Sequence, residues 1–431
     1  MGGNATKERT LEGHTHDVAS VAFHPTDASR LATGSRDGTA KIWSTMPGES
    51  VCIKTLSAHK SYPKHCVAFH PANPNLLATG SDDSSARIWN IATGECTAAL
   101  EGHSKGVNSV AFHPKHPSVF ASGSNDKTAK VWNVETGECT TTLTGHTSCV
   151  LSVAFHRTTP NLLATGSNDM TAKIWNVATG ECTKTFKGHT SYVLSVAFHP
   201  TTPNLLATGS NDGTAQVWDV ETGECSKTLA GHADTVRSVA FHPTNPNLLA
   251  TGSDDKTAKI WNAETGQCIK TLAGHTDYVT SVVFHPINPS IFASGSNDKT
   301  AKIWSVGGAQ FKALKRESES DFAAAHPIAV KTLAGDTYTL GGWGRCKDLK
   351  AAVHKLAPAT LGKPATFELL GNLGGRGEGE EGGEGVVQID GKYGSDDRRR
   401  MLVPGCGFNF ELTLVYSAAA GRRSYSTASD V

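Results

Sequence analysis

The sequence predicts an all-β protein, a ring of seven four-stranded sheets of the kind called a β-propeller. Three observations support this fold class. A unit of about 43 residues occurs seven times, and its histidines follow at steps of 45, then 44, then 43 residues. Each unit contains four short apolar runs, and residues typical of turns separate them. Several short strands in a repeating unit of this length are typical of propeller blades.

The fifth unit shows the four expected strands, which are CTKTF, VLSVAF, LLATGS and TAQVW. These runs are too short for helices and are rich in Val, Thr and Phe, which favours strands. Between them stand Gly-His, Pro-Thr-Thr-Pro-Asn and Asn-Asp-Gly, which are residues that turns prefer. The seven units predict a propeller over residues 1–305.

The units resemble WD40 repeats over about residues 6–305. The resemblance rests on a Gly-His, a Ser-x-Asp and a Trp that recur in register, although Ala58 replaces one of the glycines. The Trp-Asp dipeptide itself occurs only at Trp218-Asp219. In this family a repeat begins with the outer strand of the preceding blade, so the resemblance implies that residues 6–12 supply the outer strand of the seventh blade. The segment after Trp304, SVGGAQFKALK, is the alternative, and the spacing of residues 6–12 to the following Gly-His favours the N-terminal segment.

The resemblance also implies a hydrogen-bonded tetrad in each blade, in which Trp donates to Ser, Ser bonds to His and His bonds to Asp. Seven equal sets suit an architectural role, because an active site needs one set, so we expect no catalytic residues and no enzyme activity. The expected tetrads are His14, Ser35, Asp37, Trp43; His59, Ser81, Asp83, Trp89; His103, Ser124, Asp126, Trp132; His146, Ser167, Asp169, Trp175; His189, Ser210, Asp212, Trp218; His232, Ser253, Asp255, Trp261; and His275, Ser296, Asp298, Trp304.

Two further series follow the repeat. A second histidine after each Phe begins the loop between two inner strands, and we expect it to cap that loop; its members are His24, His70, His113, His156, His199, His242 and His285. These side chains stand in separate blades, which argues against a metal site, and we expect neither metal nor cofactor. The cysteines at one repeat position are expected to be small buried side chains in a reducing compartment; they are Cys52, Cys96, Cys139, Cys182, Cys225 and Cys268.

In the WD40 family, partners dock on a face formed by three positions per blade. These are the third and fifth residues after the Gly-His histidine and the residue before the tetrad Asp. On that basis the expected partner-binding residues are Cys149, Leu151, Tyr192, Leu194, Tyr278, Arg36, Arg237 and Asp254. Exposed apolar residues that adjoin usually mark a binding site, and tyrosine is a frequent hot-spot residue. The alternative is a structural role, in which these side chains only pack against the loops.

Composition limits the remaining functions. Lys plus Arg equals Asp plus Glu at 40 each, so no chain-wide attraction to nucleic acid is expected. No stretch of about 20 apolar residues predicts a transmembrane segment. The start Met-Gly-Gly-Asn-Ala-Thr fits the loose pattern for myristoylation of Gly2, and a plain initiator segment is the favoured interpretation. A cytoplasmic or nuclear location is expected.

After Trp304 the repeat stops. Residues 306–326 are expected to be a linker, and residues 327–417 to form a ubiquitin-like domain with a disordered insertion at 374–400, followed by a tail at 418–431. The hairpin VKTLAGDTYTL, the helical spacing of KDLKAAVHKL and the later runs PATFELLGNL and FNFELTLVYS carry this resemblance to the β-grasp family. An unstructured tail is the equal alternative.

The sequence therefore predicts a scaffold or adaptor that binds other proteins or peptide segments, does not bind nucleic acid directly, and is a subunit of a larger complex. The C-terminal resemblance would link it to ubiquitin or proteasome pathways. The alternative is a chromatin-associated reader of histone tails, although the mapped positions lack the aromatic pair that would clamp an arginine.

Overall fold

The computed structural model describes residues 8–46, 51–57, 59 and 66–306, together with six strands further along the chain. The chain divides into two units, Met1–Gly308 and Ala309–Val431. The first unit holds the seven repeats.

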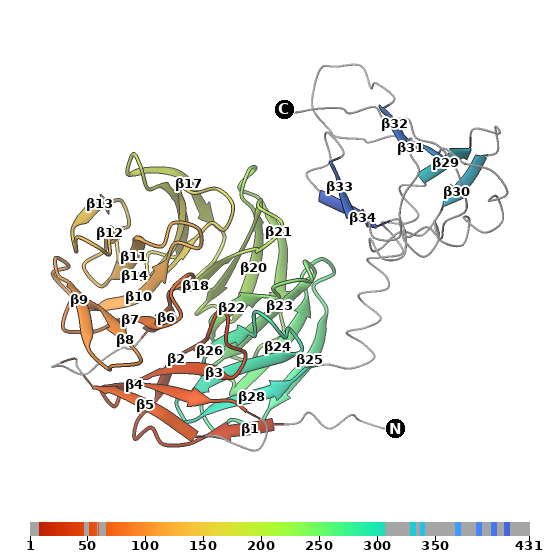
Figure 1. The fold of residues 1–431 in the computed structure, drawn as a ribbon. Helices are drawn as coiled ribbons and strands as arrows, with labels where there is room; N and C mark the ends of the chain where they lie inside the picture. The colour runs from red at the N-terminus through yellow and green to blue at the C-terminus, as the bar shows by residue number, and fades with distance from the viewer. Residues whose placement is uncertain are drawn as a thin grey trace. The chain divides into compact units, whose positions relative to one another are not determined.

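Seven four-stranded antiparallel sheets surround one centre in the first unit (Figure 1). The first three sheets are β2 (Val18–Phe23), β3 (Arg30–Ser35), β4 (Thr39–Ser44), β5 (Val51–Ser57); β6 (Cys66–Phe69), β7 (Leu76–Gly80), β8 (Ala86–Asn90), β9 (Cys96–Leu100); and β10 (Val107–Phe112), β11 (Val119–Ser124), β12 (Ala129–Asn133), β13 (Cys139–Leu143). The next three are β14 (Val150–Phe155), β15 (Leu162–Ser167), β16 (Thr171–Asn176), β17 (Glu181–Lys187); β18 (Val193–Phe198), β19 (Leu205–Ser210), β20 (Thr214–Asp219), β21 (Cys225–Ala230); and β22 (Val236–Phe241), β23 (Leu248–Ser253), β24 (Thr257–Asn262), β25 (Cys268–Ala273). The all-β propeller that the repeats predict is confirmed.

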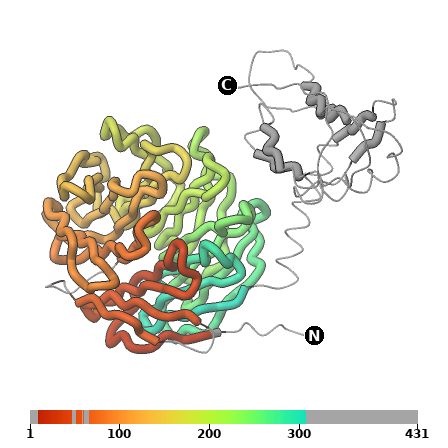
Figure 2. The backbone as a smooth tube through the Cα atoms, in the orientation of Figure 1, coloured from red at the N-terminus to blue at the C-terminus, as the bar shows by residue number. Residues whose placement is uncertain are grey.

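The seventh sheet closes the ring with both ends of the unit. It contains β26 (Val279–Phe284), β27 (Ile291–Ser296), β28 (Ala301–Ser305) and the N-terminal β1 (Glu8–Leu11). β1 pairs antiparallel with β28, with Leu11 opposite Ala301. Figure 2 shows the red start of the ring beside its blue-green end. Of the two segments that could supply this outer strand, the N-terminal one does so, which leaves no open edge on β28.

The hydrophobic core lies between neighbouring sheets. Ile174 and Phe186 of the fourth sheet pack with Val193 and Trp218 of the fifth, and each is at most 2% exposed. The innermost strands combine buried with partly buried residues, whereas the second strand of each sheet is buried on both faces. Each sheet therefore depends on the next one for its apolar contacts.

A circle of serine hydrogen bonds joins the inner strands. The backbone N–H of Val21 in the first sheet donates to Ser281 Oγ in the seventh at 3.2 Å, and that of Val196 donates to Ser152 Oγ in the preceding sheet at 3.1 Å. Four other serines do the same around the ring: Ser20, Ser109, Ser195 and Ser238. In the second sheet Cys66 takes this place, with a backbone hydrogen bond to Val110.

The second histidine series caps its loops, as predicted, and also links the sheets. His24 Nδ1 accepts the backbone N–H of Asp27 at 2.8 Å. Because that nitrogen accepts, Nε2 carries the proton and donates to the Pro74 carbonyl in the next sheet at 2.9 Å. His285 donates likewise to Ala28 of the first sheet at 3.0 Å, so this link also crosses the closure of the ring.

The repeat cysteines are not buried, and our prediction for them was wrong. Cys96, Cys139, Cys182, Cys225 and Cys268 are exposed and Cys52 is half-buried; all six are free thiols. Each stands at or near the start of an outer strand. Figure 1 shows outer strands such as β5 and β9 at the rim of the ring. No further strand covers that edge, so only an apolar residue later in the strand, such as Leu143 at 1% exposure, enters the core between sheets.

The second unit contains two small sheets in the part that the structure describes. One has the order β30-β29-β31-β32 and the other pairs β33 with β34. Their bounds are β29 (Ile328–Thr332), β30 (Thr337–Leu340), β31 (Phe367–Gly371), β32 (Gly385–Ile389), β33 (Arg398–Leu402) and β34 (Asn409–Thr413). β29 and β30 form the expected hairpin.

The other predictions for this unit have different outcomes. β32 and the first residues of β33 fall inside 374–400, so disorder throughout that range was a wrong prediction; GVVQI is an apolar run that suits a strand. The expected helix over 347–356, the linker and the tail lie outside the described residues. The ubiquitin-like fold stays a prediction.

Candidate protein-binding face

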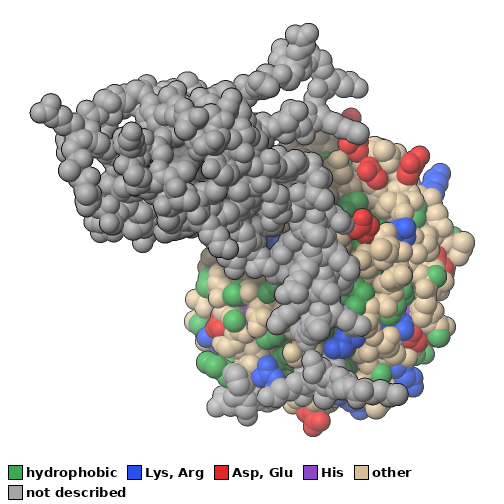
Figure 3. Space-filling view, turned by 90° about the vertical axis from the view of Figure 1, so that its right-hand side faces the viewer, with side chains coloured by type: hydrophobic (Ala, Val, Ile, Leu, Met, Phe, Trp, Pro, Cys, Tyr) green, Lys and Arg blue, Asp and Glu red, His purple; other side chains and the backbone are tan. Residues whose placement is uncertain are grey.

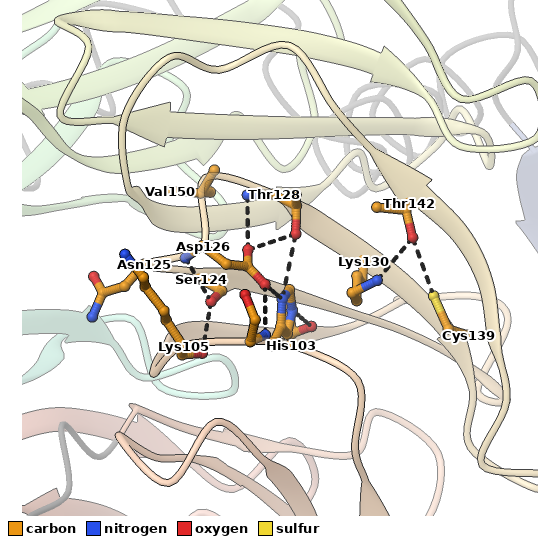
Figure 4. Close-up of polar contacts among 12 residues, drawn as sticks. His103, Lys105, Ser124, Asn125, Asp126, Thr128, Lys130, Cys139, Thr142 and Val150 are labelled. Atoms are coloured by element: carbon orange, nitrogen blue, oxygen red, sulfur yellow. Dashed lines mark hydrogen bonds and ion pairs between the residues drawn. The ribbon is translucent and has the colours of Figure 1, made fainter.

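Each blade contains a buried polar network at one end of the sheet. In the third blade, His103 Nδ1 bonds to Asp126 Oδ2 at 2.7 Å (Figure 4). His103 Nε2 bonds to Ser122 Oγ at 2.8 Å, and Trp132 Nε1 donates to the same oxygen at 2.8 Å. The His, Asp and Trp of the expected tetrads thus take the roles that the resemblance implied.

The hydroxyl in this network was wrongly assigned. It comes from the residue two positions before the expected serine, and its seven members are Thr33, Thr79, Ser122, Thr165, Thr208, Thr251 and Ser294. Trp218 stands opposite Leu206, so its indole reaches Thr208, whereas Ser210 lies about 6.6 Å further along the strand. Both positions carry a hydroxyl residue in all seven repeats, so the sequence offered two candidates and no means to choose.

The expected serines hold the tight turn instead. Ser124 Oγ donates to the Lys105 carbonyl at 2.8 Å and accepts the backbone N–H of Asp126 at 3.1 Å (Figure 4). The Asp126 carboxylate accepts from Thr128 Oγ1 at 2.7 Å and from the backbone of Ser104 at 3.1 Å. Ser35, Ser167, Ser210, Ser253 and Ser296 make the same pair of bonds in their blades. In the second blade, Ser81 Oγ accepts the N–H of Asp83 at 3.2 Å.

The bonds of His103 are compatible with a neutral ring. An ionised Asp only accepts, so His103 donates from Nδ1, and its Nε2 then accepts from the serine hydroxyl. Burial accordingly lowers the pKa of His103 against the opposing effect of Asp126. Burial raises the pKa of Asp255, but hydrogen bonds from Thr257 and His232 outweigh it and lower that pKa to about 2.

The tetrad hydroxyls belong to residues that are at most 2% exposed. The tetrad hydroxyl already donates to histidine and accepts from tryptophan, and Thr208 is 0% exposed, so no substrate atom reaches it. No group of three or more His, Cys, Asp or Glu side chains that could hold a metal occurs among the described residues. The networks make each blade rigid and position the turns above it.

The expected partner-binding residues differ in exposure. Tyr192 is 44% exposed and Tyr278 is 37% exposed, while Leu151, Leu194 and Cys149 are half-buried. Cys149 Sγ also donates to the Asn125 carbonyl of the preceding blade at 3.6 Å. The two tyrosines therefore present the most apolar surface at the mapped positions, and the leucines contribute less than a freely exposed pair would.

Two of the charged residues at the mapped positions, Arg237 and Asp254, are joined to each other. Arg237 uses Nε and Nη2 to hold both carboxylate oxygens of Asp254, with Nη2 to Oδ2 at 2.7 Å. The Arg237 guanidinium also lies 5.6 Å from the centre of the Tyr278 ring, a cation–π contact. Burial raises the pKa of Asp254 despite Arg237, and the charges of Asp234 and Asp277 raise it further. Sequence spacing gave no sign that Arg237, Asp254 and Tyr278 form one group across two blades.

Arg36 stands apart from that group in the first blade. Its Nη1 pairs with Asp17 Oδ2 at 3.1 Å, and its side chain is 47% exposed. A largely solvent-exposed ion pair of this kind contributes little to the stability of the fold. The Arg36 guanidinium is therefore available to a partner at the mapped positions.

A second set of exposed apolar residues was missed. Met46, Val51 and Ile53 in the first blade and Ile287 in the seventh are 52–54% exposed. The signal lay in the repeat comparison, because the position of Val51 holds Glu or Gln in the second to sixth units. Arg9 of β1 donates to the Thr45 and Met46 carbonyls and so ties the closing strand to this loop.

The outer flank of the ring has a mixed surface. Figure 3 shows one flank, on which acidic, basic and apolar side chains of the described residues alternate with polar ones and no broad apolar area forms. Within the described part of the chain, no helix is long and apolar enough to cross a membrane.

Comparison with known proteins gives one family. The family model "WD domain, G-beta repeat" matches seven ranges, 5–44, 50–90, 94–133, 137–176, 180–219, 223–262 and 266–305. Human WD repeat-containing protein 86 is 39% identical over 66 residues, which is 15% of this chain and 17% of that protein. Nuclear distribution protein PAC1-2 of Uncinocarpus reesii is 43% identical over 61 residues, 12% of this chain and 13% of that protein. The chain thus spans less than a fifth of the length of these relatives.

Proposed function

Because the chain belongs to the WD40-repeat family, we propose that it is a non-catalytic scaffold that binds other proteins through the face carrying Tyr192 and Tyr278. The observation that carries this proposal is the exposure of these two rings, 44% and 37%, above networks whose polar groups are otherwise satisfied. Large aromatic side chains with few rotamers are typical anchors of protein interfaces.

We propose that the Arg237 group sets specificity at this face. Arg237 is already oriented by Asp254 and by the Tyr278 ring, so a partner would not have to order it. Among the described contacts the Arg237 Nη1 makes no hydrogen bond, so we propose that it donates to an acceptor on the partner, while Asp234 and Asp277 add negative charge around Asp254. The same carboxylates favour the alternative function, a reader of basic histone tails.

We further propose that the protein is a subunit of a larger complex in the cytoplasm or nucleus. A proposed link to ubiquitin pathways rests on the hairpin sequence of residues 330–340 alone. The eight described cysteines are free thiols, which supports a reducing compartment.

The test is a pull-down with the full chain, identification of the captured partners, and measurement of the affinity of the chain for each of them. Tyr192→Ala with Leu194→Ala, and separately Tyr278→Ala, are expected to weaken binding about thirtyfold, as hot-spot truncations of roughly 2 kcal/mol do. Met46→Ala is the matched control, because Met46 is at least as exposed as the two tyrosines but is not one of the mapped positions. Circular dichroism confirms folding.

The outcomes separate the candidates. Loss of binding in the tyrosine variants alone supports the face, and equal binding by all variants refutes it. A captured partner whose affinity falls steeply with salt and with Asp234→Asn supports the histone-tail alternative, whereas one insensitive to both supports the scaffold.

A further inference from the structure

The outer strand of the first sheet exposes apolar side chains along an open edge. β5 is the last strand of its sheet, so one edge of its backbone pairs with no described strand (Figure 1). Alternate residues of the strand are exposed, beginning with Val51, Ile53 and Thr55. Val51 is 54% exposed and Ile53 is 53% exposed. An edge of this kind offers unpaired backbone groups and apolar surface together.

The other outer strands carry polar residues at these two positions, with one exception. The position of Val51 holds Glu95, Glu138, Glu181, Glu224 and Gln267 in the second to sixth units. The position of Ile53 holds Ile269 in the sixth unit and otherwise a hydroxyl that donates to a carbonyl of the neighbouring strand, from Thr97, Thr140, Thr183 and Ser226. Charged side chains on an edge strand oppose pairing with another chain, and β5 has lost that protection at Val51.

The surroundings of β5 are cationic. Three cations on or beside the strand donate to neutral oxygens: Lys54 to the Thr93 carbonyl at 3.1 Å, Lys41 to Thr55 Oγ1 at 3.0 Å and Arg9 to the Thr45 carbonyl at 2.7 Å. Thr45 follows Ser44, which lies opposite Val51, so Arg9 stands near the start of the strand. None of the three cations forms an ion pair with a carboxylate in the part of the chain that the structure describes, and the sequence of β5, VCIKTLS, has no acidic residue.

We propose that the edge of β5 is a docking site for an extended protein segment with apolar residues at alternate positions and acidic residues between them. The backbone of such a segment pairs with the open edge, and its apolar side chains cover Val51 and Ile53. Its carboxylates approach Lys41, Lys54 and Arg9, whose charges lack a described carboxylate partner. The site uses none of the positions mapped around Tyr192 and Tyr278, so the ring would hold a second protein.

The charges favour such a partner over a second copy of this chain. If two β5 strands paired edge to edge, Lys41 and Lys54 of both copies would meet at one interface. Neither strand carries a carboxylate to oppose these charges, and like charges on paired strands are destabilising.

The probe is a short synthetic peptide of alternating Glu and Val or Ile residues with blocked ends, and fluorescence polarisation measures its affinity for the full chain. Val51→Glu with Ile53→Thr gives β5 the residues of the second to fourth blades and should weaken binding about tenfold. The matched control makes the same exchange in the sixth blade, Gln267→Glu with Ile269→Thr, and should leave the affinity unchanged. Lys41→Gln, which installs the residue of the fifth blade, should weaken binding about threefold, the effect of one unit charge about 6 Å away in water.

Five results would overturn the proposal. They are no binding by the unmodified chain, equal affinity of the β5 variant and the control, equal binding of a peptide with Lys in place of Glu, equal binding of a peptide N-methylated at every amide, and a dimer in sedimentation that Val51→Glu with Ile53→Thr dissociates. The last result would make a second copy the occupant. Tyr192→Ala with Leu194→Ala should bind the peptide as the unmodified chain does, which separates this site from the face proposed above. Circular dichroism of each variant checks that the ring is intact.

Discussion

Replacing Thr208 by valine tests the corrected network most directly. Valine has nearly the same shape but no hydroxyl, so two groups lose their partner at once: the Trp218 indole N–H, now 2.8 Å from Thr208 Oγ1, and His189 Nε2, at 2.7 Å. Thr208 is 0% exposed, so water does not replace the oxygen. At about 1–3 kcal/mol for each unsatisfied buried group, the free energy of unfolding should fall by about 3 kcal/mol or more.

Ser210→Ala is the matched control, because Ser210 has the place in the tetrad that the sequence alone suggested. Ser210 is also 0% exposed, but the partners of its hydroxyl, the Ser191 carbonyl and the Asp212 N–H, belong to partly exposed residues of a turn. We expect a loss of about 1 kcal/mol. Urea unfolding of the full chain, followed by tryptophan fluorescence, measures both variants. The reasoning is refuted if Ser210→Ala costs as much as Thr208→Val.

Two further predictions concern pH and ring closure. Burial lowers the pKa of His103, His189 and His232 below the ordinary value. Below about pH 6.5 the unfolded chain therefore binds protons that the folded chain does not, and the folded state loses stability as the pH falls. The urea midpoint of unfolding should be lower at pH 5.5 than at pH 7.5, and an unchanged or higher midpoint would contradict the neutral networks. Deleting residues 1–12 removes β1 and exposes the edge of β28, so the melting temperature should fall or the chain should associate, and light scattering with thermal melting checks both; a truncated chain that melts like the intact one would show that β1 contributes no stability.

The repeats made the architecture predictable, and the details that failed share a cause. Seven units at spacings of 43 to 45 residues predict seven similar sheets, and the distance from Leu11 to the first Gly-His predicts the closing strand. The tetrad hydroxyl was ambiguous because Thr208 and Ser210 point to the same side of one strand, and only the position of the Trp218 indole decides between them.

Contacts between blades were the least predictable part of the candidate site. Arg237 and Tyr278 are 41 residues apart, and their stacking depends on how the sixth and seventh sheets lie against each other. The prediction that Cys139 is buried failed for a related reason. An apolar residue in a strand is expected to be covered, but the outer strand is the last strand of its sheet, and the neighbouring blade covers only part of that strand.

The replacement of serine by Cys66 makes the ring mechanically unequal. Six joints between inner strands rest on a hydroxyl oxygen, whereas the joint between the second and third sheets rests on sulfur, a weaker acceptor, and burial raises the pKa of this thiol to about 12, so it stays uncharged. In a closed circle of nearest-neighbour links, strain from heat or force collects at the weakest one. The Val110 amide should therefore exchange its proton with solvent sooner than the Val196 amide, and the circle should open at the second blade before it opens where the two ends of the unit meet.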